Sequence, residues 1–191
     1  MTKQSGGTRN YRISSKQYQN RLTEYNGIVS TGVYRDSNFY EGGGYYVVHK
    51  DHNQIVHKGE LGDGAQHDNR EDVCAEFLAK KGYKIFLMSE KSYITGGKKN
   101  DGFLNHAQID IKTINSAGKY TIKAAIDKAA SQGAEVAILF QNTKSMTQKY
   151  VQSQFDMYMK DLRQHPNLKW NMKEVIVVGL SGRIHRRKVD I

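Results

Sequence analysis

The chain has 191 residues and a formal net charge of +10 at pH 7, from 29 Lys and Arg against 19 Asp and Glu. This length suits one domain with its own core, and the basic excess favours an anionic partner, with nucleic acid first. The single cysteine, Cys74, excludes an intrachain disulfide framework. No apolar run approaches the roughly 20 residues of a membrane span and residues 1–10 contain no hydrophobic segment, so we expect a cytoplasmic protein without a signal peptide.

Residues 1–40 are polar and are expected to form an N-terminal extension whose first ten residues are disordered. Within it, Tyr18, Leu22 and Tyr25 recur at helical spacing and predict a short helix over residues 15–25. Residues 41–191 show no internal repeat and no low-complexity block, so they are expected to form one domain.

A β-hairpin rich in histidine is predicted to follow. Residues 45–49 and 54–58 have the composition of strands, and residues 50–53 that of a turn. The hairpin carries His49, His52 and His57. Imidazole is a common ligand of transition metals, but there is no cysteine nearby and no helix to bring these histidines together, so we do not expect a histidine metal site.

A helix over residues 70–82 is predicted by an apolar stripe and by the glycine that follows it, Gly82. Glu71 lies in the first turn at the edge of the stripe, whereas Glu76 points further towards solvent. Glu71 either belongs to a functional site or only complements the helix dipole. Residues 83–88 are predicted to be a strand, and residues 89–100 a polar loop.

The second half of the chain alternates strands and helices. A hairpin over residues 101–112 is followed by a helix at about 119–132, an apolar strand at 135–140, a helix at 146–164 and a strand at 175–178. A strand, a helix and a buried strand in succession are typical of a crossover with parallel pairing. The last residues are predicted to be a basic tail that contacts nucleic acid through Arg183, Arg186, Arg187 and Lys188.

The hairpin over residues 101–112 brings charged residues together. With a two-residue turn at Asn105-His106, Gly102 pairs with Ile109 and Asp101 lies opposite Asp110. Side chains alternate between the two faces of a strand, so Asp101, Asp110 and Lys112 share one face. Directly opposite carboxylates lie about 5 Å apart, which costs stability unless a divalent cation compensates. The alternative is a surface strand with a solvated charge pair.

The acid, the hairpin and the triplet Asp110-Ile-Lys112 resemble the signature of the PD-(D/E)XK nucleases, with Asn100 in place of the proline. The spacing of Glu71, Cys74, Leu78 and Gly82 matches the first helix of many members. The resemblance covers about residues 70–141. It implies an α/β (α+β) fold of the restriction-endonuclease type, a mixed sheet flanked by helices, here with an N-terminal β-hairpin extension.

The same resemblance implies roles for these residues. Glu71, Asp101 and Asp110 would hold Mg²⁺ or Mn²⁺ and Lys112 would act at the phosphate of DNA or RNA, with Gln132 supporting the site. The order of elements and the run Lys-Ala-Ala-Ser-Gln-Gly-Ala at residues 128–134 also resemble nuclease domains of contact-dependent inhibition toxins and phage-borne relatives. That implies a toxin or mobile-element nuclease with a cognate immunity protein.

Two other functions stay open. Some of those toxin domains are barnase-like and cleave tRNA without a metal, in which case His49, His52 or His57 would act as acid or base with Lys112. A non-catalytic nucleic-acid-binding module is the third hypothesis. The sequence decides neither between DNA and tRNA nor the oligomeric state.

Overall fold

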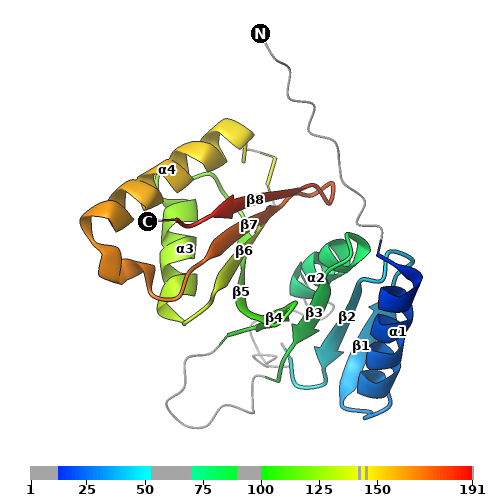
Figure 1. The fold of residues 1–191 in the computed structure, drawn as a ribbon. Helices are drawn as coiled ribbons and strands as arrows, with labels where there is room; N and C mark the ends of the chain where they lie inside the picture. Colours follow the sequence, from blue (N-terminus) through cyan, green and yellow to red (C-terminus); the bar gives the residue numbers. More distant parts are fainter. Residues whose placement is uncertain (1–12, 53–69, 90–99, 142, 145, 191) are drawn as a thin grey trace, which may run out of the picture.

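The computed structural model describes residues 13–52, 70–89, 100–141, 143–144 and 146–190. Its strands form one mixed sheet of eight strands whose spatial order follows the chain from β1 to β8. The expected α+β class, a mixed sheet flanked by helices, is confirmed (Figure 1). The elements are α1 (Ser15–Val29), β1 (Tyr34–Phe39), β2 (Tyr45–His49), α2 (Arg70–Lys80), β3 (Lys84–Leu87), β4 (Gly102–Leu104), β5 (Ala107–Ile114), α3 (Thr121–Ser131), β6 (Val136–Gln141), α4 (Gln148–Gln164), the 3₁₀ helix η1 (Pro166–Lys169), β7 (Glu174–Val178) and β8 (Ile184–Lys188).

The sheet contains both parallel and antiparallel strand pairs, and the chain connections explain which pairs are parallel. The parallel pairs are β2 with β3, β5 with β6, and β6 with β7. Each of these pairs is joined through a helix, α2, α3 or α4, because a parallel connection must return across the sheet. The pairs β1–β2, β3–β4, β4–β5 and β7–β8 are antiparallel.

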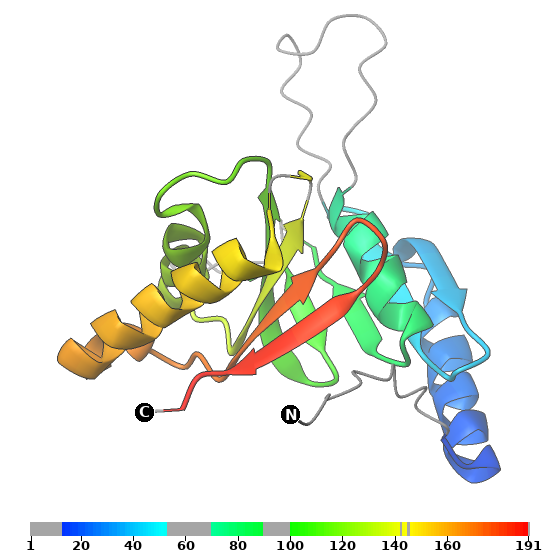
Figure 2. The same cartoon turned by 90° about the horizontal axis from the view of Figure 1, so that it is seen from above.

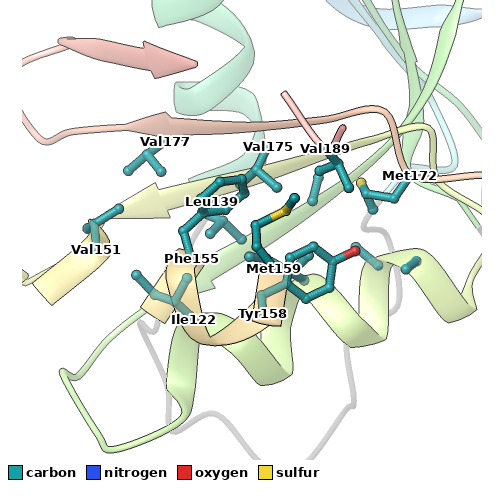
Figure 3. Close-up of a cluster of buried hydrophobic side chains, with 14 of the residues drawn as sticks. Ile122, Leu139, Val151, Phe155, Tyr158, Met159, Met172, Val175, Val177 and Val189 are labelled. Carbon is teal, nitrogen blue, oxygen red and sulfur yellow. The ribbon is translucent and has the colours of Figure 1, made fainter. Parts of the chain in front are cut away.

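The core divides between the two faces of the sheet. Helices α3 and α4 pack on one face and α2 packs on the other (Figures 1 and 2). Figure 3 shows Ile122 of α3 and Tyr158 of α4 beside Leu139 of β6 and Val175 of β7, which belong to the first of these cores. On the other face, Leu78 of α2 is buried in the same cluster as residues of β2, β3, β5, β6 and β7.

The N-terminal segment contributes α1 and the strand β1 to the fold. Ser14 caps α1 through a capping box with Gln17, which satisfies amides at the helix start. The ring of Tyr25 packs on Tyr45 of β2 at 5.4 Å between centroids. The described partner of β2 on this side is the upstream strand β1. The expected partner strand at residues 54–58, with His57, lies outside the described residues.

The expectation of a basic tail is wrong, because residues 184–188 form β8 and pair with β7. Arg186 makes two hydrogen bonds to Glu174, at 2.5 and 2.7 Å. Arg187 instead lies 5.9 Å from the ring of Phe155 on α4. Neighbouring residues of a strand point to opposite faces, so Arg186 and Arg187 lie on opposite faces of the sheet.

Among the described helices, none is long and apolar enough to cross a membrane.

Candidate functional site: an acidic cluster where two strands part

The turn between β4 and β5 has the geometry that the sequence predicts. Asn105 and His106 both have positive φ, 48° and 91°, as a two-residue hairpin turn requires. The observed pairs are Gly102 with Ile109, Phe103 with Gln108, and Leu104 with Ala107. The three pairs expected for residues 102–104 are therefore confirmed, whereas Asp101 precedes β4 and the expected pair of Asp101 with Asp110 is not part of this ladder.

The two strands part immediately beyond this hairpin. Strand β4 begins at Gly102, whereas β5 continues to Ile114 with only β6 beside it. The amide of Ile111 donates a hydrogen bond to Asp101 Oδ2 at 2.5 Å. The side chain of Asp101 thus takes the position that a neighbouring strand's carbonyl would otherwise occupy. We call the place where β4 and β5 separate the fork.

Next to the fork, β4 packs unusually close to β3. A Cβ atom on Gly102 would lie 1.7 Å from the carbonyl oxygen of Phe86 on β3. Only glycine therefore lets β4 lie at this distance from β3. This contact fixes the strand that immediately follows Asp101.

Asp110 and Lys112 lie on β5 next to the fork. Their pairing partners on β6, Ala137 and Leu139, belong to the core beneath α3 and α4, so both side chains face that side of the sheet. The Asp110 side chain is fully buried, and Lys112 Nζ lies 2.5 Å from its Oδ2. Within the described part of the chain, Asp110 Oδ1 has no hydrogen-bond partner. Burial raises the pKa of Asp110, although the bond to Lys112 opposes that shift.

Glu71 lies in the first turn of α2, near enough for its charge to act on Asp101 and Asp110. Its Oε2 lies 2.8 Å from Nε2 of His52, whose Nδ1 lies 2.8 Å from the carbonyl oxygen of Met88. A carbonyl oxygen only accepts, so Nδ1 of His52 must donate. Burial is the largest single influence and lowers the pKa of His52, but the hydrogen bond to Glu71, the charges of Glu71 and Asp101 and the bond to Met88 together outweigh it, so the pKa is raised. Glu76 is elsewhere and pairs with Lys80 at 2.7 Å.

The electrostatics show that the three acids act on one another. Burial, followed by the charges of Glu71 and Asp110, raises the pKa of Asp101 from 3.8 to about 7. The charge of Glu71 also raises the pKa of Asp110. Acids from α2, from the residue before β4 and from β5 therefore lie near enough for charge to act between them, and we call these three the acidic cluster.

The donor set is one that a hard divalent cation takes, because Mg²⁺ and Mn²⁺ prefer carboxylate oxygens. Such an ion would relieve both the repulsion at Asp101 and the unpartnered oxygen of Asp110. As the side chains stand, the described residues contain no group of three His, Cys, Asp or Glu arranged to hold an ion. Lys112 is bonded to Asp110 instead, so loading an ion requires these side chains to rearrange.

The remaining residues singled out from the sequence make the contacts given below or lie outside the described residues. Strands β6 and β7 separate β5 from β8 and its basic side chains. Gln132 is the C-cap of α3. His49 accepts a hydrogen bond from the amide of Asp51 at 3.1 Å. Lys128 of α3, to which the sequence analysis gave no role, is near enough for its charge to lower the pKa of Asp110.

Comparison with known proteins adds little to this picture. No protein-family model matches the chain, and no curated protein matches it. Among solved structures it is similar to the CdiA-CT/CdiI toxin and immunity complex from Burkholderia pseudomallei, with 19% sequence identity and a TM-score of 0.45. That match covers 68% of this chain and 93% of the other. Similarity at this level leaves the function of the chain open.

Proposed function

We propose that the chain is a metal-dependent nuclease that hydrolyses phosphodiester bonds in DNA or RNA, with its active site at the fork. The observation that supports this most is that the charges of Glu71 on α2 and Asp110 on β5 act on Asp101 before β4, and that Asp110 pairs with Lys112 on the same strand. The formal net charge of +10 favours a polyanionic substrate. The sequence resemblance to PD-(D/E)XK nucleases supports the same choice.

Each residue has a role that follows from its surroundings. Glu71, Asp101 and Asp110 would hold Mg²⁺ or Mn²⁺, which when bound polarises a phosphate and activates water. Lys112 would donate to the oxygen on which negative charge develops. The Lys112 side chain is 20% exposed and pairs with the fully buried Asp110, so binding of an ion by Asp110 would free the ammonium group for the substrate.

The metal-free RNase alternative needs a histidine that can exchange protons with the substrate. His52 fits this role poorly, because it is 1% exposed and both ring nitrogens already lie 2.8 Å from protein oxygens. The alternative would therefore depend on other histidines together with Lys112.

We further propose, from the sequence resemblance to contact-dependent inhibition toxins, that this nuclease acts as a toxin. Its substrate would then lie in the cytoplasm of a target cell, and a cognate immunity protein would protect the producer. Rescue of cells expressing the chain by a neighbouring open reading frame would test this role separately from the chemistry.

The chemistry is tested by incubating the protein with plasmid, single-stranded DNA and total tRNA in Mg²⁺, in Mn²⁺ or in EDTA. We expect cleavage with a divalent ion and none in EDTA. Asp110→Ala should abolish cleavage and weaken Mn²⁺ binding in calorimetry, whereas the control Glu76→Ala should change neither. Cleavage in EDTA, or full activity of Asp110→Ala, would favour the metal-free RNase. Binding of nucleic acid without turnover in any metal would favour the non-catalytic module.

A further inference from the structure

His52 is a buried polar residue that joins three elements near the fork. It follows β2, its Nδ1 bonds the Met88 carbonyl just after β3, and its Nε2 bonds Glu71 at the start of α2. Only 1% of the residue is exposed. A buried polar side chain with both ring nitrogens engaged is held in one orientation.

The structure assigns His52 the role of a positioning residue that holds the Glu71 carboxylate in the acidic cluster. This inference rests on the proposed function of the fork, because the position of Glu71 matters for catalysis only if Glu71 is a metal ligand there.

A rigid ring is well suited to this task. Glutamate has three rotatable side-chain bonds, and fixing a long side chain costs conformational entropy. The imidazole of His52 spans from the backbone of Met88 to Glu71 Oε2 through two bonds of 2.8 Å each. The backbone just after β3 therefore fixes the Glu71 carboxylate through the ring of His52. A misplacement of about 1 Å at a reacting site can cost about a hundredfold in rate, so such a support has consequences for catalysis.

The competing view is that His52 only ties β2 to the end of β3 and fills space. Bond counting separates the two roles. The side-chain amide nitrogen of asparagine lies as many bonds from Cβ as Nδ1 of histidine does. His52→Asn can therefore keep the hydrogen bond to the Met88 carbonyl and must lose the hydrogen bond to Glu71. A glutamine amide lies as many bonds from Cβ as Nε2 does, so His52→Gln can keep Glu71 and loses Met88.

The first experiment compares the steady-state kinetics of these two variants in Mn²⁺, with thermal unfolding measured alongside. We expect His52→Asn to lose about 10- to 100-fold in kcat with little change in KM, the range typical of residues that orient metal ligands. His52→Gln should retain most of the activity. The assignment is overturned if His52→Asn is as active as the wild type, or if His52→Gln loses as much kcat as His52→Asn.

A double-mutant cycle tests whether His52 acts through Glu71. If it does, His52→Asn in a Glu71→Ala background should cause less than about a twofold further loss in kcat, because the group that it positions is already absent. Additive losses would overturn the assignment.

A third measurement does not depend on activity or on folding of the His52 variants. In ¹⁵N spectra of the histidine rings, Glu71→Ala should shift the Nε2 resonance of His52 and leave Nδ1 nearly unchanged. The matched control is Glu76→Ala on the same helix, which should shift neither. An unshifted Nε2 in Glu71→Ala overturns the assignment even in an active nuclease. Conversely, a wild-type protein that cleaves no substrate refutes the proposed nuclease, whatever the spectra show.

Discussion

Neutralising Asp101 should stabilise the metal-free protein at neutral pH and remove much of the dependence of its stability on pH. Burial and the charges of Glu71 and Asp110 raise the pKa of Asp101 from 3.8 to about 7. Asp101→Asn removes the charge but keeps a side-chain oxygen that can accept the hydrogen bond of the Ile111 amide. The substitution is therefore close to isosteric, and its effect should be mainly electrostatic.

The sign and size follow from proton linkage. Between pH 3.8 and about 7 the folded protein binds a proton at Asp101 that the unfolded chain has released, so stability falls as pH rises through this window. A shift of about 3 pKa units at about 1.4 kcal/mol each gives an upper limit of about 4 kcal/mol. For a domain of this size, each kcal/mol changes Tm by about 2–4 °C.

The assay is thermal or urea unfolding at pH 5 and pH 8 in EDTA. We expect the wild type to be less stable at pH 8, and Asp101→Asn to lose most of that difference. His52, whose raised pKa also favours the protonated folded state, should leave a smaller residual trend of the same sign. Adding Mn²⁺ should stabilise the wild type at pH 8 more than the variant. Equal stability of the two proteins at pH 8 in EDTA would refute the reasoning.

Three further predictions concern the phosphate, the basic strand and the fork. Lys112→Ala should lose about a hundred- to thousandfold in kcat while keeping Mn²⁺ affinity in calorimetry, and Lys112→Arg should restore activity only in part because its planar group places charge differently. Neutralising exposed residues of the β8 region should reduce the log–log salt slope of duplex binding by about 0.9 for each phosphate that the protein no longer neutralises, and an unchanged slope would place the binding surface elsewhere. Arg186 is best left intact there because it pairs with Glu174, and Arg187 because it is half-buried against Phe155, so the residues to change are Arg183 and Lys188. Gly102→Ala should destabilise the protein by more than about 1 kcal/mol in urea unfolding, because its Cβ would meet a carbonyl at 1.7 Å. Gly27→Ala in α1 meets nothing within 4 Å and should stabilise by about 0.5–1 kcal/mol.

Local signals in the sequence sufficed for most elements. Apolar periodicity located α2, α3 and α4 to within a few residues, because each has to bury one face against a neighbour, and a continuous apolar run located β6, which is buried on both faces. The sequence does not predict strand β1, because its residues, Tyr-Arg-Asp-Ser-Asn-Phe, are mostly polar and half of them are exposed. For the same reason the sequence predicts a basic tail where the structure has strand β8. Both are edge strands, whose charged residues follow from having one neighbour rather than two.

The sequence by itself determined the hairpin and hence the shared face of Asp110 and Lys112. A two-residue turn and the alternation of a strand leave one register, and these are local constraints. The family resemblance named Glu71, but only the tertiary structure decided that the charge of Glu71 acts on Asp101 and Asp110 from a helix on the opposite face of the sheet, and that His52 contacts Glu71. Glu71 and His52 meet because α2 crosses between the parallel strands β2 and β3, which brings a helix start and two strand ends to one edge. No spacing along the chain encodes that meeting, since it depends on the packing of α2 against the sheet.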